Sequence, residues 1–449
     1  MTQETPPHAP PLESRVSFFP SLTMPAYHPA SALRDYLKPF LRCLGAWQQR
    51  RLLAVATGVL QSGSSILSEG CRAGGDDAVP RWVQKASRLL ETLPWHDLFA
   101  RHDHRLRERR RQWRLVVHDT TALPKPWAEK MEGLSTVHDG CTGELVTGYT
   151  LFVSVGVGKG HWDLHPIRTT IINPAAADFR SQNTAMQEHL KAILNAGIGE
   201  DLLHVFDRGF DDEKHFHFLD GQRVAWMIRL KDNRHVTFRG EEHPITLVAS
   251  TILRERPAVR EGIIYAKTDI GITLTQDASG EKITPETRTY ALVAVQRPQF
   301  REPMLLLLKG RIRSWREAVH AYGDYLDRWE VENCIRLQKQ TLHPSQVQLM
   351  TAPRIQGLLH LQIILLDFLL REHEKGRDPF GSGLWELLRT RYVHDGETLT
   401  MSPCVVARAV RDLLREDRIR APQHLRASCT VPTMQLMLLA PPPLDTLCV

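Results

Sequence analysis

The sequence predicts an α/β protein in which a mixed sheet flanked by helices is interrupted by a β-rich insertion, with helical N-terminal and C-terminal regions. Three observations lead to this prediction. Between residues 113 and 231, short apolar runs of strand type alternate with helical patterns, in the order strand, strand, strand, helix, strand, helix, strand. Residues 232–310 hold several further β-rich runs and no convincing helix. Apolar residues recur at three- and four-residue spacing in residues 31–112 and again after residue 311, as in amphipathic helices.

The N-terminal part begins with a polar, proline-rich stretch. Residues 1–30, which include "MTQETPPHAPPLESRV", lack an apolar run, so we expect a disordered tail rather than a signal peptide. The stretch "LRDYLKPFLRCLGAWQQRRLLAVATGVLQ" then opens a helical domain that we place at residues 31–112. This domain ends in "RHDHRLRERRRQWR", a strongly basic segment that also fits a solvated helix end.

Residues 113–231 form the first part of the predicted sheet. The predicted strands lie in "RLVVHDTT", "ELVTGYTLFVSVGVGKGHWDLHPIRTTII", which holds two strands around a glycine-rich turn, "DLLHVFDRGF" and "VAWMIRLK". The helical patterns "NTAMQEHLKAILNAGIG" and "DDEKHFHFLDG" separate the last strands. The first three strands have only turns between them, so they can pair as an antiparallel meander.

Residues 311–373 add a charged helix in "YLDRWEVENCIRLQKQ" and an apolar helix in "LLHLQIILLDFLL". The apolar stretch is interrupted by His360, Gln362 and Asp367, so it fits a buried helix better than a membrane span. We expect a helical C-terminal region at residues 374–449.

The composition sets broad limits on function. With 449 residues, 42% of them hydrophobic and 24% charged, the chain can form about two to four structural units with an ordinary globular core. The net charge of +6 is compatible with a polyanionic partner but does not require one. The seven cysteines are scattered, with no Cys-x-x-Cys pair, which argues against a disulfide framework or a structural zinc site and favours reduced thiols in a cytoplasm.

Two aspartates follow apolar runs at comparable places. Asp119 comes after "RLVV" and Asp207 after "LLHVF". A carboxylate at the end of a sheet strand is held on a rigid element and points into the crevice beyond it, where α/β sheets place their ligand sites. Two such carboxylates on neighbouring strands need a neutralising cation, and all-oxygen sites suit Mg²⁺ or Mn²⁺. Either aspartate taken alone also fits an ordinary turn or helix cap.

The charged helix supplies a third acid. On an ideal helix, four side chains able to bind metal or phosphate oxygens fall within about 60° of one another. They are Tyr325, Arg328, Glu332 and Lys339. The other acids of the helix, Asp327 and Glu330, project elsewhere. The alternative interpretation is a solvated helix whose charges form ion pairs three or four residues apart.

These stretches together resemble a known family. "VVHDTT", "VFDRGF" and "YLDRWEVENCIRLQK" are similar to segments of the insertion-sequence-four family of bacterial DDE transposases. The last stretch matches that family's Tyr-(2)-Arg-(3)-Glu-(6)-Lys signature at every position, and "RLKDNRHV" also resembles the family. The resemblance extends from about residue 32 to about residue 375. It implies that residues 113–231 and 311–373 are two parts of a ribonuclease H-like core, separated by the insertion at residues 232–310.

The resemblance also implies the chemistry. Asp119, Asp207 and Glu332 would form a catalytic, metal-binding triad that holds two Mg²⁺ ions, for which Mn²⁺ can substitute. The reaction would be cleavage of the element ends and their joining to target DNA by two-metal phosphoryl transfer, along a cut-and-paste pathway. Two alternatives remain open: a catalytically silent or repurposed DNA-binding protein, and a ribonuclease H-like endonuclease that does not join strands.

By motif position, the residues that would contact DNA phosphates are Tyr325, Arg328, Lys339 and, within the "DRGF" box, Arg208. The best-studied hairpin-forming members carry a tryptophan ahead of the signature tyrosine, which stacks on a flipped base. The matching position here holds Met304, the candidate base wedge. A methionine lacks the aromatic face on which a base stacks, so the chain departs from the family at the hairpin step.

The expected partners are double-stranded DNA, comprising inverted repeats and target, and a second copy of the chain. The resemblance implies a homodimer on paired ends, with residues 374–449 as a possible dimerisation region, although an internal packing role for the apolar helix is equally open. The helical domain at residues 31–112 is the expected reader of the element ends. Its candidate contacts are Arg42, Arg50, Arg51, Arg109, Arg110 and Arg111. We expect no membrane association and a cytoplasmic, nucleoid-associated bacterial protein.

Overall fold

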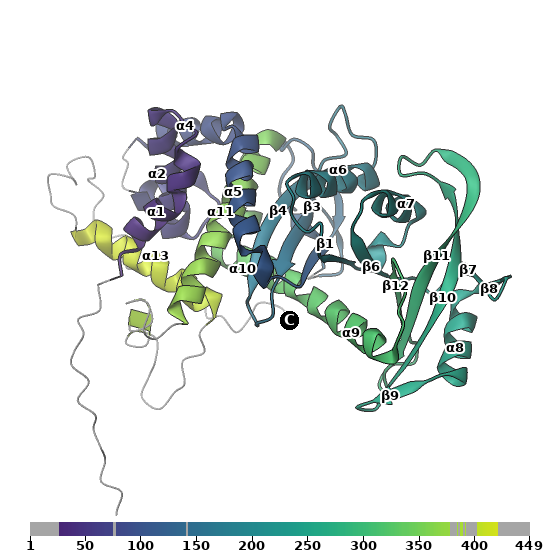
Figure 1. The fold of residues 1–449 in the computed structure, drawn as a ribbon. Helices are drawn as coiled ribbons and strands as arrows, with labels where there is room; N and C mark the ends of the chain where they lie inside the picture. The colour runs from purple at the N-terminus through teal and green to yellow at the C-terminus, as the bar shows by residue number, and fades with distance from the viewer. Residues whose placement is uncertain are drawn as a thin grey trace, which may run out of the picture.

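The computed structural model describes residues 27–74, 78–140, 142–377 and 402–420, with residues 384, 387, 388 and 391 as isolated positions. At its centre is an open, mostly antiparallel sheet of twelve strands. A group of helices stands at one end of this sheet (Figure 1). The expected mixed α/β class is therefore confirmed.

The helical end of the molecule is built from segments far apart in the chain. Its helices are α1 (Pro29–Leu41), α2 (Ala46–Ser62), α3 (Leu67–Gly74), α4 (Val79–Thr92), α5 (Trp95–Arg109) and α13 (Pro403–Arg420). Helices α2 and α3 approach closely because glycines face each other: a Cβ on Gly58 would lie 2.6 Å from the carbonyl oxygen of Gly70. Helix α13 packs on α2, and its side chains Val406, Val410 and Leu414 are buried in the chain's own core.

The half of the sheet nearer to this helical end is formed by the next strands of the chain. Its strands are β1 (Leu115–Pro124), β2 (Ser135–His138), β3 (Leu145–Val157), β4 (Leu164–Ile172), β5 (Leu203–Phe206) and β6 (Ala225–Arg229). β1 pairs antiparallel with β3 and β3 with β4, which is the predicted meander. β5 and β6 run parallel to β1. Helices α6 (Gln182–Asn195) and α7 (Glu213–Gly221) make the crossovers that parallel strands require.

The strands of residues 232–310 extend the same sheet. They are β7 (His235–Phe238), β8 (Glu241–Pro244), β9 (Ala258–Arg260), β10 (Ile263–Gln276), β11 (Lys282–Gln296) and β12 (Met304–Leu308). β12 pairs antiparallel with β6, and β11 and β10 follow, so the segment is hydrogen-bonded directly onto the core.

The expectation of no helix in this segment is wrong. Residues Ile245–Glu255, which begin with the run "ITLVAS", form helix α8. A short apolar run does not by itself distinguish a strand from a buried helix. Packing decides here, because the buried residues recur at helical spacing, at Ile245, Val248, Ala249 and Ile252.

The charged stretch that includes Tyr325 is not one continuous helix. Helix α9 (Trp315–Leu326) is followed by a 3₁₀ turn, η3 (Asp327–Trp329), and then by α10 (Glu330–Leu342). A 3₁₀ turn has about three residues per turn instead of 3.6, so the uniform stripe of an ideal helix is interrupted. The predicted angles are therefore wrong in detail, and individual contacts decide which side chains share a site.

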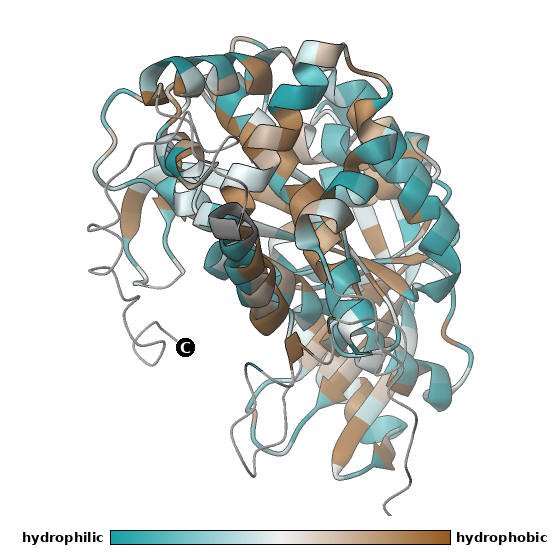
Figure 2. Ribbon diagram, turned by 90° about the vertical axis from the view of Figure 1, so that its left-hand side faces the viewer, coloured by the Kyte–Doolittle hydropathy of each residue, from teal (hydrophilic) through white to brown (hydrophobic). Residues whose placement is uncertain are grey.

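Helix α11 (Ala352–Gly376) has the length and composition of a membrane span, but most of its residues are buried inside the protein. Two of its polar residues have internal hydrogen-bond partners. Gln362 donates to the hydroxyl of Ser65 at 2.6 Å, and Asp367 accepts from the hydroxyl of Tyr36 at 2.6 Å. Figure 2 shows hydrophobic and hydrophilic segments alternating along the helices, as expected of helices that cover a core. Such burial is typical of the core helix of a soluble protein.

Candidate active site

Two of the expected acids meet at one edge of the sheet. β1 pairs with β5 only as far as His118, which lies opposite Phe206. Asp119 and Asp207 are the next residues on these neighbouring parallel strands, so the register places them side by side. Asp119 is not at the end of its strand, as the sequence predicted, because β1 continues past it along β3. It is the first residue beyond the ladder with β5.

Each aspartate uses one oxygen for local structure. Asp119 Oδ1 accepts a hydrogen bond from the backbone N–H of Thr120 at 2.7 Å. Asp207 Oδ1 accepts from the backbone N–H of Gly209 at 2.8 Å and caps a 3₁₀ turn, η2 (Arg208–Phe210). The turn chemistry that the sequence left as an alternative is thus present at Asp207 but not at Asp119, which lies within β1. At both positions the second carboxylate oxygen is left for other contacts.

Arg328 connects this edge to the helix. One terminal nitrogen of its guanidinium donates to Asp119 Oδ2 at 2.8 Å, and the other donates to Glu332 Oε1 at 3.0 Å. Arg328 lies in η3 and Glu332 in the first turn of α10, so their pairing survives the interruption of the helix. The side chains of Arg328 and Asp119 are only 14% and 13% exposed. Asp119, Arg328 and Glu332 therefore form one connected, largely buried group.

Tyr325 and Lys339 flank this group. The guanidinium carbon of Arg328 lies 6.0 Å from the centre of the buried Tyr325 ring. Lys339 Nζ donates to the hydroxyl of Thr121 at 3.1 Å. Residues two apart on a strand share a face, so Thr121 and Asp119 point the same way and α10 lies along β1. Arg328 and Lys339 thus contact the strand that carries Asp119, and Glu332 joins it through Arg328, whereas Tyr325 lies beside Arg328 and near Arg229 at the end of β6.

The two acids that the sequence set aside are engaged elsewhere. Asp327 forms an ion pair with Arg114, at the end of the helical domain. Glu330 Oε1 lies 3.3 Å from Nδ1 of His161, in the turn between β3 and β4. Neither carboxylate contacts Asp119 or Arg328, so the structure separates them from Glu332.

A charged pocket of about 280 Å³ adjoins Asp207 at the same edge. Its lining includes Arg208, Arg229 and Arg301 together with Asp232, Glu302 and Phe300. Arg208 is exposed, next to Asp207 in the chain. Arg229 is a site residue that sequence reasoning missed: it ends β6 and influences the hydroxyl of Tyr325 electrostatically. Since β5 and β6 are parallel neighbours, the reasoning that selected the residue after β5 would also have selected Arg229.

Met304 also lies at this edge, although outside the group around Arg328. It begins β12, which pairs antiparallel with β6, so its position is just beyond the end of β6. Its side chain is half-buried and packs against the main core. Much of its surface is therefore already covered by the chain itself.

The electrostatics of the group leave negative charge in excess. The pKa of Asp119 is raised to about 6, mainly by burial and further by Asp207 and Glu332, although Arg328 opposes the shift. One arginine does not balance three carboxylates. Among the residues that the structure describes, no group of three or more Asp, Glu, His or Cys side chains forms a ready-made metal site. The guanidinium of Arg328 stands between Asp119 and Glu332 instead.

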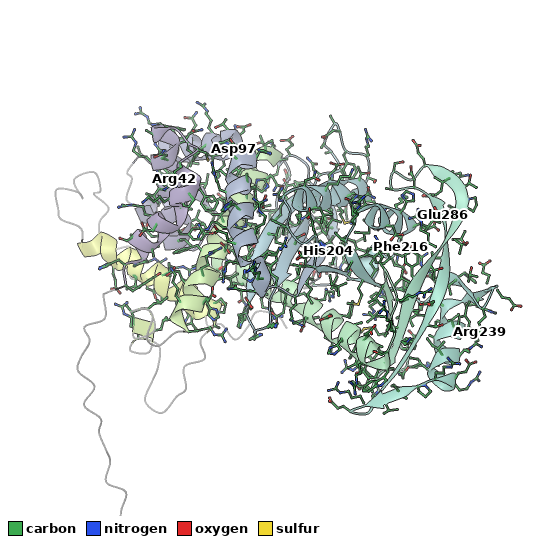
Figure 3. The ribbon with its side chains drawn as sticks, in the orientation of Figure 1. Arg42, Asp97, His204, Phe216, Arg239 and Glu286 are labelled. Carbon is green, nitrogen blue, oxygen red and sulfur yellow. The ribbon has the colours of Figure 1, made fainter. Side chains whose placement is uncertain are left out.

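The first three candidate DNA-end contacts lie on the helical end of the molecule. Arg42 and Arg50 are exposed and Arg51 is half-buried. Figure 3 shows Arg42 on this end, away from His204 in the sheet. Exposed guanidinium groups suit contact with the phosphates of a duplex, but these residues are not part of the edge that carries Asp119.

The other candidate contacts end or follow α5, and two of them form ion pairs with acids outside the helical domain. Arg109 forms an ion pair with Glu374 of α11. Arg110 forms an ion pair with Asp201, just before β5, at 3.0 Å. Arg111 is exposed. Two of these three arginines thus share their charge with acids of the same chain.

The opposite face of β1 carries a different kind of polar structure. His118, next to Asp119 in the chain, is fully buried on the side of the sheet that faces α6. It belongs to a continuous hydrogen-bonded chain with spacings of 2.7 to 3.0 Å. The members of this histidine chain are, in order, Thr170, His189, Ser154, His118, His204 and the carbonyl of Gly199.

The direction of the histidine chain follows from its last link. A carbonyl can only accept, so His204 donates through Nε2 and its Nδ1 accepts from His118. By the same reasoning Ser154 donates to His118 and accepts from His189. Burial lowers the pKa of His204 to about 4 and holds the pKa of His118 well below its ordinary value. The rings are therefore neutral, and each of their nitrogens has a partner.

Comparison with known proteins adds no family assignment. A scan against models of protein families gives no match, and a search of curated proteins finds no similar sequence. What the site can do chemically therefore rests on its own residues. It combines three carboxylates at one sheet edge with a cationic side chain between two of them and further cations nearby.

Proposed function

We propose that this protein is a metal-dependent DNA transposase of the DDE type, which cleaves the ends of its element and joins them to target DNA. The observation that carries the proposal is the meeting of Asp119, Asp207 and Glu332 at one edge of the sheet. These are the three carboxylates that the sequence motifs select, and they come from segments far apart in the chain.

The arrangement of the strands supports a ribonuclease H-like core. In that fold an antiparallel meander of three strands is joined by two strands that run parallel to the first. Here the order across the sheet is β4, β3, β1, β5 and β6, with β5 and β6 parallel to β1. Catalytic acids on the first strand and after the next parallel one then become neighbours, as Asp119 and Asp207 are.

The donor set fits Mg²⁺, with Mn²⁺ as a substitute. Asp119, Asp207 and Glu332 offer carboxylate oxygens, which hard divalent cations prefer. The raised pKa of Asp119 reflects burial and an excess of negative charge that cations would balance. When bound, two such ions supply Lewis-acid stabilisation and an activated water or 3′-hydroxyl for attack on a phosphodiester.

The chain's own cations would position the DNA strand. Arg328 presents a planar fork that matches phosphate oxygens, whereas Lys339 acts as a point charge beside it. Arg208, exposed next to Asp207, would hold a phosphate on the other side of the carboxylates. The buried Tyr325 ring supports the guanidinium of Arg328 and offers its hydroxyl as a hydrogen-bond donor.

The proposal is tested with the purified full-length chain, Mg²⁺ and DNA that carries the element's own ends. Glu332→Ala should abolish cleavage and retain end binding, because it removes a metal ligand but no cation. Glu330→Ala is the matched control: it lies in the same helical turn, but its carboxylate faces His161. It should cleave about as well as the wild type. If Glu330→Ala is inactive and Glu332→Ala is active, the site assignment is wrong.

The same assay separates the alternative functions. Cleavage followed by joining of the ends to target DNA supports a transposase. Cleavage without any joining would indicate a ribonuclease H-like endonuclease. Retarded migration of the DNA without cleavage would indicate a catalytically silent DNA-binding protein.

A further inference from the structure

Arg328 lies between two carboxylates, where a bound cation would be expected. We propose that Arg328 competes with a divalent ion for Asp119 and Glu332, and that it exchanges these two carboxylates for a DNA phosphate when the ion binds. This inference rests on the proposed function and adds to it a direct competition between a side chain and the metal.

The contacts of Arg328 are those of a bridging cation. Its two terminal nitrogens donate to different carboxylates, at 2.8 Å to Asp119 and at 3.0 Å to Glu332. An arginine often binds one carboxylate through two parallel hydrogen bonds. The guanidinium of Arg328 instead divides its hydrogen bonds between two carboxylates. It is also largely buried, at 14% exposure.

Both oxygens of Asp119 already accept a hydrogen bond, so a metal ion would compete with the present donors for its charge. Its Oδ1 already accepts from the backbone N–H of Thr120 at 2.7 Å, and its Oδ2 accepts from Arg328. A metal ion that binds Asp119 and Glu332 together would coordinate the same two carboxylates that Arg328 now bridges. Ligand distances of about 2.0–2.1 Å for Mg²⁺ would bring the ion close to the guanidinium, and like charges at such spacing oppose each other in a largely buried site.

A DNA phosphate would be an alternative binding partner for Arg328. The planar guanidinium binds phosphate oxygens as well as carboxylate oxygens, and the phosphate brings the negative charge that Arg328 loses when it leaves the acids. Arg328 then offsets part of the negative charge of the site when substrate is absent, and the metal ions offset it when substrate is bound. Metal and DNA should therefore favour each other's binding, since each one releases Arg328 for the other.

The test measures the binding of Mn²⁺ alone, without DNA, from the free Mn²⁺ signal in electron paramagnetic resonance. Arg328→Gln should bind Mn²⁺ on the order of tenfold more tightly than the wild type, because charge-assisted hydrogen bonds no longer compete for the carboxylates. Arg316→Gln is the matched control: this exposed arginine near the start of α9 changes the net charge equally and should leave Mn²⁺ affinity unchanged. Affinity in Arg328→Gln equal to or weaker than in the wild type would overturn the inference.

A second variant keeps the test open if Arg328→Gln does not fold, as judged by circular dichroism. Arg328→Lys retains the charge, but one ammonium nitrogen cannot reproduce the fork that reaches both carboxylates. Mn²⁺ affinity above that of the wild type supports the competition, and affinity equal to or below it overturns the competition.

The inference and the proposed function can fail separately. Cleavage of element ends by the wild type, with no gain of Mn²⁺ affinity in Arg328→Gln, would support the function and overturn the competition. A gain of Mn²⁺ affinity in a protein that does not cleave its element ends would support the competition and contradict the transposase.

Discussion

His118 and Asp119 are neighbours on β1, and the two faces of the sheet to which they belong treat polar groups in opposite ways. Behind the strand, His118 is one link of the histidine chain, in which each ring nitrogen has a partner within the protein. In front of it, Asp119 shares a single arginine with Glu332, and burial with neighbouring acids raises its pKa to about 6.

We interpret this difference as a division between polar groups that stabilise the fold and polar groups that bind a ligand. A matched network of buried groups stabilises one arrangement and needs nothing from solvent. A group of carboxylates with too little positive charge beside it destabilises the folded chain, and it remains able to bind a cation. Each of the following variants tests this contrast, from the largest expected effect to the smallest.

Asp119→Asn should damage function without damaging the fold. Asparagine keeps the shape of the side chain but cannot carry its charge, so DNA cleavage should fall by at least about 10²- to 10³-fold. Burial and acidic neighbours disfavour the ionised form of Asp119 in the folded chain. Asparagine removes this unfavourable charge, so the melting temperature at pH 7 should rise by a few degrees. Cleavage assays and thermal melts measure the two effects. A marked fall in melting temperature would show that Asp119 serves the fold, as His118 does.

Ser154→Ala should have the reverse effect. Ser154 donates to His118 and accepts from His189, so its removal leaves two buried ring nitrogens without partners. Each unmatched buried group costs about 1–3 kcal/mol, so the free energy of unfolding in urea should fall by about 2–4 kcal/mol. Mn²⁺ affinity of the folded protein should stay at the wild-type value.

Ser250→Ala is the control for this variant, because Ser250 is exposed on α8 and bonds only its own helix. Its unfolding free energy should change by less than about 0.5 kcal/mol. A loss in Ser154→Ala as small as that of the control would mean that the histidine chain does not stabilise the sheet.

The sequence predicts the carboxylate side of β1 better than the side that carries the histidine chain. Asp119, Asp207 and Glu332 stand out because charged residues beside apolar runs need a reason, and their spacing matches a known motif. His118 and Ser154 also interrupt apolar runs, in "RLVVHDTT" and "FVSVGV". Their partners are fixed only by the register of β1 with β3 and β5, and local spacing does not specify register between distant segments.

The errors of the sequence prediction have the same origin. Helix α8 was expected to be strand because its short apolar run fits both periods, and packing against the sheet decides between them. The 3₁₀ turn before Glu330 depends on how α9 packs on β10 and β11 while α10 packs on β1, and Arg114 holds that turn through Asp327. Arg229 was missed because its importance comes from the strand order, which no single segment reveals.

The two faces should also respond oppositely to pH. Burial lowers the pKa of His204 from 6.5 to about 4, so the unfolded chain takes up a proton that the folded chain refuses, and stability falls between about pH 6.5 and pH 4. Asp119, with its pKa raised from 3.8 to about 6, takes up its proton first in the folded chain, so its contribution to stability rises over about pH 6 to pH 4. The stability advantage of Asp119→Asn over the wild type at pH 7 should therefore vanish by about pH 4. Melting temperatures of both proteins across this range check it, and an undiminished advantage at pH 4 would contradict it.

The smallest effect is expected at the accessible end of the histidine chain. Thr170 donates to His189 Nδ1 at 2.8 Å, but Thr170 is half-buried, so water can replace its hydroxyl. Thr170→Val keeps the shape of the side chain and leaves one acceptor unmatched, so the free energy of unfolding in urea should fall by about 1 kcal/mol or less. A larger loss in Thr170→Val than in Ser154→Ala would mean that the network is held from its end rather than from its centre. The histidine chain would then depend on a residue that solvent reaches. It would no longer differ from the carboxylate side of β1 in being satisfied entirely within the protein.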